Sequence, residues 1–347
     1  MKIAVAAPLS GPAAALGREM AQAARMAVED SARDQPEIGI DIIDDRGDEE
    51  TGVEIARSLV ADESIVALLG HYNSNITLRA APLYDTGLPL IAPIVSNPTL
   101  TDSGWRNVFR FTNRDDATAA AIAQHLIATG KRRACVVVSG TTYGTSMGHE
   151  FARAFDGLGG KTLSCHRVEE GETKFEALVE QLPRGIDILF YGGTFEGAPL
   201  LRTMRTRGRD VLLATGDGCW DRVNFLEPAG AAAEAGEGVL VLSACPEIGR
   251  VQGSREFAAR YEQRFGQIGN YAVNAYDAAK LLISAIRTVG RRADRASVGD
   301  AIRHTEWRGI AYPEPVRWDE KGDNVSAVTA LHVVKNHRFS QVALIPR

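Results

Sequence analysis

The chain opens with Ile3-Ala-Val-Ala-Ala-Pro8, a short apolar run that ends at a proline, and a stretch of helical spacing follows at residues 17–31. The same unit returns along the next part of the chain, with predicted strands at 38–43, 65–69 and 88–93 and predicted helices at 51–61 and 75–84. This alternation predicts a doubly wound parallel α/β sheet, in which ligands bind beyond the carboxyl ends of the strands.

A second set of the same kind begins after Phe109-Arg-Phe111. Its predicted strands lie at 134–139, 162–168, 186–191 and 211–215, and its predicted helices at 115–129, 143–158, 175–182 and 195–207. Three further helices (254–265, 271–289, 297–303) and two strands (327–335, 338–345) follow, and the small residues of 229–235 predict a loop or a helix end.

Because the pattern restarts without a long linker, we expect two α/β lobes of doubly wound parallel sheet joined by a hinge of several strands. Residues 1–116 and 247–322 are assigned to the first lobe, and residues 117–246 and 323–347 to the second. The length of 347 residues agrees with two lobes, since one hydrophobic core seldom organises so long a chain.

The composition is that of an ordinary globular protein, with 45% hydrophobic and 24% charged residues. The net charge of -5 gives no concentrated positive field, which argues against nucleic acid as a partner. No apolar run approaches the roughly 20 residues that cross a bilayer, so we expect no membrane anchor. The apolar start is too short for a signal-peptide core, which leaves a cytoplasmic protein or one whose signal has been removed.

Four cysteines, Cys135, Cys165, Cys219 and Cys245, lie far apart and lack CxxC spacing. This spacing argues against a zinc site and a redox pair and predicts buried free thiols, with one disulfide bridge left open.

Motifs that tie a reaction to a spacing are missing from the sequence: GxSxG, the Walker loop, GxGxxG, HExxH and the EF-hand pattern do not occur. We therefore predict a protein that is not an enzyme and has no cofactor and no metal. Acidic residues cluster between Asp41 and Glu50 and could hold a hard cation through oxygen. Alternatively, Asp48, Glu49 and Glu50 stabilise the positive end of the following helix.

Polar groups suited to a zwitterion follow several predicted strands. Ser74 stands at the start of a predicted helix, where unpaired backbone donors favour a carboxylate, and Ser96 lies in the next such loop. Asp217, set between two glycines after a strand, could accept hydrogen bonds from an ammonium group. Simple capping of the helices at Ser74 and at Trp220 would explain Ser74 and Asp217 without a ligand.

Taken in order, these loops resemble the leucine/isoleucine/valine-binding protein family, the type 1 periplasmic receptors that deliver solutes to ABC importers. The resemblance runs from end to end, and the order and spacing of its motifs carry it. The motifs are Pro8-Leu-Ser-Gly-Pro12, Leu16-Gly17, Asp44-Asp45, Gly70-His71, Ser74, Pro93 before Ser96, Tyr143-Gly144, Tyr191-Gly-Gly193 and Trp318-Asp-Glu-Lys-Gly-Asp323.

The resemblance implies a periplasmic, monomeric solute-binding component of an ABC importer, with a membrane permease and an ATPase as partners. Its ligand would be a small amino acid, branched-chain or a related aliphatic or aromatic one, bound between two closing lobes. Two alternatives stay open: a receptor of the same fold for a small aromatic acid or amide, and a ligand-sensing regulator.

The resemblance also implies which residues bind. The ligand carboxylate would meet Ser74, Ser96 and the backbone at Ile94, and the ammonium would meet Tyr143 and Asp217. Thr194 and Leu16 stand where the family often has aromatic residues, so Tyr72, Trp220, Phe195 and Tyr271 could rebuild the apolar wall. Gly47 and Asn73 occupy the expected places of the family's first-lobe disulfide.

Overall fold

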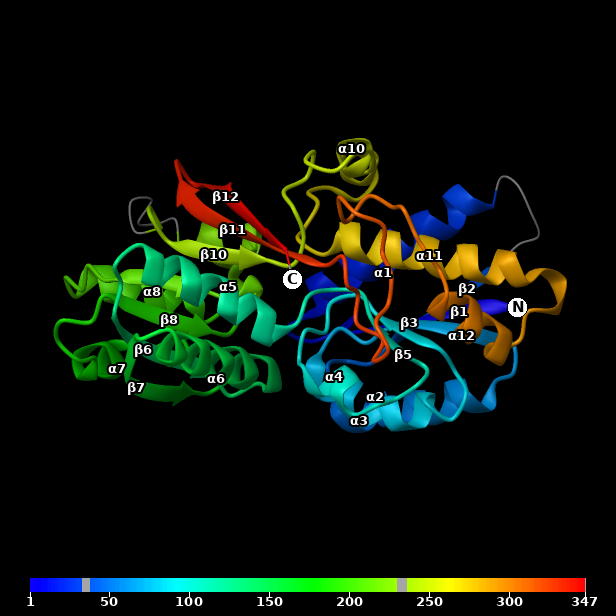
Figure 1. Cartoon of the computed structure of the whole chain (residues 1–347), viewed down its shortest axis with the longest axis horizontal. Coiled ribbons are helices and arrows are strands. Elements are labelled where there is room, and N and C mark those ends of the chain that lie inside the picture. The colour runs from blue at the N-terminus through cyan, green and yellow to red at the C-terminus, as the bar shows by residue number, and fades with distance from the viewer. Residues whose placement is uncertain (33–37, 230–235, 347) are drawn as a thin grey trace. The chain divides into compact units, whose positions relative to one another are not determined.

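The computed structural model describes residues 1–32, 38–229 and 236–346, so most of the predicted loop at 229–235 lies outside the described residues. The chain folds into two compact units (Figure 1). Unit 1 contains Met1–Asn113 and Cys245–Val328, and unit 2 contains Arg114–Ala244 and Thr329–Pro346. Residues 323–328, which the sequence analysis assigned to the second lobe, group with unit 1 because Asp323 and Asn324 bond to Arg110 and Phe111 there.

Unit 1 is built on a five-stranded sheet of order β2-β1-β3-β4-β5, in which every neighbouring pair is parallel. The strands are β1 (Lys2–Ala7), β2 (Gly39–Asp44), β3 (Ile65–Gly70), β4 (Leu90–Ala92) and β5 (Val108–Arg110). Its helices are α1 (Ala14–Ser31), α2 (Glu49–Ala61), α3 (Ser74–Tyr84), α4 (Thr99–Asp102), α10 (Ser254–Phe265), α11 (Ala272–Val289) and α12 (Arg295–Arg303).

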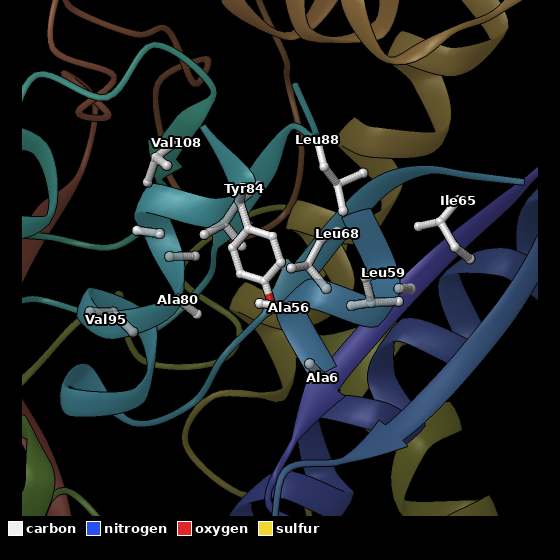
Figure 2. Close-up of a cluster of buried hydrophobic side chains, with 14 of the residues drawn as sticks. Ala6, Ala56, Leu59, Ile65, Leu68, Ala80, Tyr84, Leu88, Val95 and Val108 are labelled. Atoms are coloured by element: carbon white, nitrogen blue, oxygen red, sulfur yellow. The ribbon is translucent and has the colours of Figure 1, made fainter. Parts of the chain in front are cut away.

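Helices cover both faces of the unit 1 sheet: α1 and α11 pack together on one face, and α2 and α3 on the other (Figure 1). Beneath α2 and α3 lies a core of small and branched side chains from the sheet and the helices. Figure 2 shows the ring of Tyr84 among these side chains, with Leu68 and Leu88 beside it. This doubly wound arrangement confirms the predicted class of the first sheet and places the loops after β1, β3 and β4 at one edge.

Unit 2 is built on a seven-stranded sheet of order β12-β11-β10-β9-β8-β6-β7. The strands are β6 (Arg133–Ser139), β7 (Lys161–Val168), β8 (Ile188–Gly192), β9 (Leu212–Thr215), β10 (Leu240–Ser243), β11 (Val328–Lys335) and β12 (Arg338–Pro346). The pairings from β7 through β10 are parallel, and β10 pairs with β11 in antiparallel fashion. The second sheet is therefore mostly parallel, as predicted, with an antiparallel addition at one edge.

The helices of unit 2 are α5 (Asp115–Ala128), α6 (Thr142–Gly157), α7 (Glu176–Gln181), α8 (Gly197–Thr206) and α9 (Glu227–Ala229), with short helical turns at Asp217–Cys219 and Arg222–Leu226. Phe190 packs into the core under α5 and α6, whereas the next residue, Tyr191, lies against Gly197 at the start of α8. Consecutive strand residues point to opposite faces, so α5 and α6 cover one face of β8 and α8 covers the other.

Candidate functional site

Two hydroxyl side chains follow neighbouring strands of unit 1. β3 and β4 are parallel and in register at Leu69 and Ile91, so the loops after them emerge at the same edge of the sheet. Ser74 and Ser96 lie in these loops, each 6% exposed, and neither hydroxyl is engaged in a hydrogen bond within the described part of the chain. Both groups are therefore available to a ligand oxygen.

Ser74 is the first residue of α3 and not its N-cap. The N-cap position belongs to Asn73, and no side-chain capping bond is formed there. Simple capping, the alternative explanation for Ser74, is thus wrong. The N–H groups of the first turn of a helix have no partner inside the helix, and together with the helix dipole they favour an anion at this point.

A fully buried network fixes the segment just before Ser74. His71 Nδ1 lies 2.7 Å from Asp45 Oδ2, and His71 Nε2 lies 2.8 Å from the Tyr84 hydroxyl. None of the three residues is exposed. Both ring nitrogens of His71 are engaged, so this histidine has a structural role and holds the β3–α3 loop to the sheet and to α3.

A buried arginine that the sequence analysis missed fixes the loop that carries Ser96. The Arg110 guanidinium is 0% exposed and donates to the Val95 carbonyl at 3.0 Å and to Asp323 Oδ1 at 2.7 Å. It also donates to the Thr101 hydroxyl at 2.8 Å. A charged residue inside the apolar run Val108-Phe109-Arg110-Phe111 was the signal that could have revealed it.

The predicted apolar wall of unit 1 includes an aromatic pair. Tyr72 and Tyr271 meet edge to face, with ring centroids 5.9 Å apart and an interplanar angle of 77°. Tyr271 is 5% exposed at the start of α11, and Leu16 is 6% exposed on α1, the helix that packs against α11. The backbone at Ile94, 6% exposed, lies two residues before Ser96 in the β4–α4 loop.

Unit 2 brings together the two residues that were assigned to the ammonium group. The Tyr143 hydroxyl donates to Asp217 Oδ1 at 2.7 Å and accepts the Gly218 N–H at 2.9 Å. Burial first, and then the negative charges of Asp217 and Asp115, raise the pKa of Tyr143 well above its usual value. Tyr143 therefore stays a hydrogen-bond donor and orients the Asp217 carboxylate, which is 5% exposed.

The glycines on either side of Asp217 leave room for its neighbours. A Cβ on Gly216 would come within 2.6 Å of the Tyr143 hydroxyl, and a Cβ on Gly218 would lie 2.5 Å from the Gly193 carbonyl. Only glycine lets this turn sit so close to Tyr143 and to the β8–α8 loop. The Gly-Asp-Gly sequence thus reflects packing around the Asp217 carboxylate.

Thr194 and Trp220 lie in the same two loops of unit 2. The Thr194 N–H donates to Glu196 Oε2 at 3.3 Å, and Glu196, 1% exposed, also accepts the Tyr191 hydroxyl at 2.7 Å. The Trp220 indole stacks on His332 of β11 with centroids 5.4 Å apart. The ring of Trp220 therefore packs against the sheet of unit 2.

Sequence reasoning also missed another buried acid of unit 2. Asp115, the first residue of α5, is 0% exposed and accepts the Ser146 hydroxyl at 2.6 Å from α6. Its position at a helix start resembled an ordinary capping acid, so nothing local in the sequence marked it as buried. Asp115 adds negative charge near Tyr143 and Asp217.

Acidic side chains between Asp41 and Glu50 accept hydrogen bonds from backbone groups of unit 1. Asp44 accepts the backbone N–H groups of Leu9 and Arg46, each at 2.8 Å, and Asp48 caps α2 by accepting the Thr51 N–H. Among residues 1–32, 38–229 and 236–346, no group of three or more His, Cys, Asp or Glu side chains is placed to hold a metal ion. Asp48 therefore stabilises the start of α2, which is the alternative to a cation site given by the sequence.

None of the four cysteines is in a disulfide bond, so the one bridge that the sequence allowed is not formed. Cys135, Cys219 and Cys245 are buried as predicted, whereas Cys165 is exposed. Cys165 lies on β7, an edge strand of the unit 2 sheet. No helix in the described part of the chain combines the length and apolar character that a membrane crossing needs.

Comparisons with known proteins agree with this architecture. The family model of the periplasmic binding proteins matches residues 1–338. The Leu/Ile/Val-binding protein homolog 1 of Brucella abortus is 26% identical over 329 residues, which cover 92% of this chain and 86% of that protein.

Two solved structures extend the comparison. An ABC transporter substrate-binding protein from Desulfitobacterium hafniense in complex with Leu matches with a TM-score of 0.82 and 25% identity, covering 99% of each chain. A solute-binding protein of an ABC transporter from R. palustris in complex with benzoate has the same fold, with a TM-score of 0.88, 18% identity, and coverage of 99% of this chain and 96% of that one. The chain belongs to the periplasmic binding protein family, the non-enzymatic solute-binding components of ABC transporters.

Proposed function

We propose that this chain binds an α-amino acid and delivers it to the permease and ATPase of an ABC importer. Unit 2 supplies the contacts for the ammonium group through Asp217 and Tyr143, and unit 1 supplies those for the carboxylate through Ser74, Ser96 and the backbone at Ile94. The observation that carries the proposal is the oriented, nearly buried carboxylate of Asp217, 2.7 Å from the Tyr143 hydroxyl. A fixed anion of this kind suits a cationic group of a ligand.

The remaining predicted residues serve the ligand side chain in this proposal. Tyr72, Tyr271 and Leu16 would line it from unit 1, and Thr194 from unit 2. The indole of Trp220, whose ring stacks on His332, would contribute an edge only. The family supports the periplasm as its location, and the Brucella abortus relative supports an amino acid as its ligand. In this proposal the receptor acts as a monomer.

A second candidate function is the binding of a small aromatic acid. The aromatic pair of Tyr72 and Tyr271 favours it, and one solved structure of the same fold was determined with benzoate. Against it stands Asp217, since a ligand without an ammonium group would bring no positive charge to the nearly buried carboxylate beside it.

Calorimetric titration separates the two functions. The purified protein is titrated with the common α-amino acids, with benzoate, and with carboxylic acids that share an amino acid's side chain but lack its amino group. The proposal expects at least one amino acid to bind and its des-amino analogue to bind much more weakly. Tighter binding of benzoate or of a des-amino acid would favour the second function. A regulator would bind a ligand too, but its gene would lack permease and ATPase genes beside it.

A further inference from the structure

Glu19 is a buried acid of unit 1 that has no part in the proposed contacts with the ligand. It lies on α1 and is 7% exposed. Its Oε1 atom accepts the backbone N–H of Tyr271 at 2.9 Å and of Ala272 at 2.6 Å, across 252 and 253 residues of sequence. A carboxylate from one helix therefore caps the first turn of another, α11, where a negative charge is favoured by the helix dipole.

Gly269 makes the space for this carboxylate. A Cβ at position 269 would lie 1.9 Å from Glu19 Oε2, closer than any real contact allows. The atom in the way is the end of a flexible side chain, so an added methyl group would displace the carboxylate and leave the backbone in place. Two features therefore hold the Glu19 carboxylate at the start of α11: its hydrogen bonds to the backbone of Tyr271 and Ala272, and the space left by Gly269.

The residue that Glu19 holds is half of the aromatic pair. Tyr271 meets Tyr72 edge to face at 5.9 Å, and Tyr72 precedes Ser74 by two residues. Leu16 precedes Glu19 by three residues, which places both side chains on neighbouring positions of one face of α1. One acid therefore links the helix of Leu16 to the backbone of Tyr271.

We infer that Glu19 is a positioning residue for the choice of ligand side chain: it fixes the start of α11, holds Tyr271 against Tyr72, and so favours an aromatic over a branched aliphatic side chain. This inference rests on the proposed function. Two tyrosine rings fixed edge to face present flat and edge surfaces to a third ring, and such ring pairs contribute about two- to tenfold in affinity beyond the area they bury. A β-branched side chain gains affinity only from the burial of its apolar surface.

The test compares phenylalanine and valine as ligands by calorimetric titration of the full chain. The variants are Glu19→Gln, which weakens the cap, and Gly269→Ala, which keeps Glu19 and displaces its carboxylate. Glu29→Gln is the matched control, because Glu29 lies on the same helix but pairs with Arg264 of α10. Thermal melts of all four proteins confirm that each is folded.

The wild-type protein and Glu29→Gln should bind phenylalanine about two- to tenfold more tightly than valine. In Glu19→Gln and Gly269→Ala the ratio of the two Kd values should move toward one. A structural role alone would weaken both ligands by the same factor and leave the ratio unchanged, which would overturn the inference while the proposed function stands. A wild-type preference for valine would also overturn it, and failure to bind any amino acid would refute the proposed function together with it.

Discussion

The replacement Asp217→Asn tests the assignment of the ammonium contact with the smallest change in shape. Asp217 is 5% exposed and accepts the Tyr143 hydroxyl at 2.7 Å, so an asparagine there keeps the volume and can keep that bond. The charge is lost. A buried hydrogen bond to a charged group contributes about 1.5–3 kcal/mol, which corresponds to a loss of roughly ten- to a hundredfold in the affinity for an α-amino acid.

The ligand without an amino group should respond in the opposite direction. Its binding to the wild-type protein would remove water from the Asp217 carboxylate and supply no positive charge in return, and Asp217→Asn removes that cost. Titration calorimetry with the tightest amino acid and its des-amino analogue should therefore show one Kd rising and the other falling or staying constant. Asp210→Asn is the control, since the side chain of Asp210 is 99% exposed, and both Kd values should stay at their wild-type level.

Equal weakening of both ligands would refute the reasoning, because it would mean that Asp217 supports the fold of the site and does not recognise the ammonium group. Unchanged affinity for the amino acid would refute it as well. Tyr143→Phe provides a graded comparison: it removes the hydroxyl that orients the carboxylate, so the amino acid should lose about 0.5–1.5 kcal/mol of binding free energy.

Three predictions concern stability. Arg295 donates to four backbone carbonyls at the end of α2 and the start of β3, so Arg295→Met should lower the free energy of unfolding by about 1.5–3 kcal/mol in urea titrations; no change would refute the capping role. Tyr84→Phe leaves His71 Nε2 without its bond and should cost about 1–3 kcal/mol in the same assay, a value near zero being the contrary result. The backbone N–H of Arg132, just before β6, donates to Asp187 and lowers its pKa. The resulting stabilisation is present above the unfolded pKa and lost as the pH falls through the folded value. Asp187→Asn should therefore be less stable than wild type at neutral pH and approach it in acid, and a difference that does not depend on pH would contradict the assignment.

Secondary structure could be predicted where apolar residues recur with a regular period over a long segment. The predicted strand at 134–139 matches β6 (Arg133–Ser139), and the predicted helix at 17–31 matches most of α1 (Ala14–Ser31). The prediction lacked β5, β10 and α4, which have only three or four residues each. Segments so short carry little periodic signal of their own, and only some of them, such as β4 (Leu90–Ala92) and β9 (Leu212–Thr215), were predicted.

The sequence by itself determined the fold class, because a β-α alternation leaves few ways to bury the apolar faces of strands and helices, and it determined which loops follow the strands. The tertiary structure decided which polar groups meet. Tyr143 and Asp217 are 74 residues apart, and the strand order β9-β8-β6 places the strands that precede them on either side of β8, close enough for the two side chains to meet. Glu19 reaches Tyr271 across 252 residues, and Arg110 reaches Asp323 across 213. Burial turns such acids and bases into fixed contacts, and burial depends on what the rest of the chain packs around them.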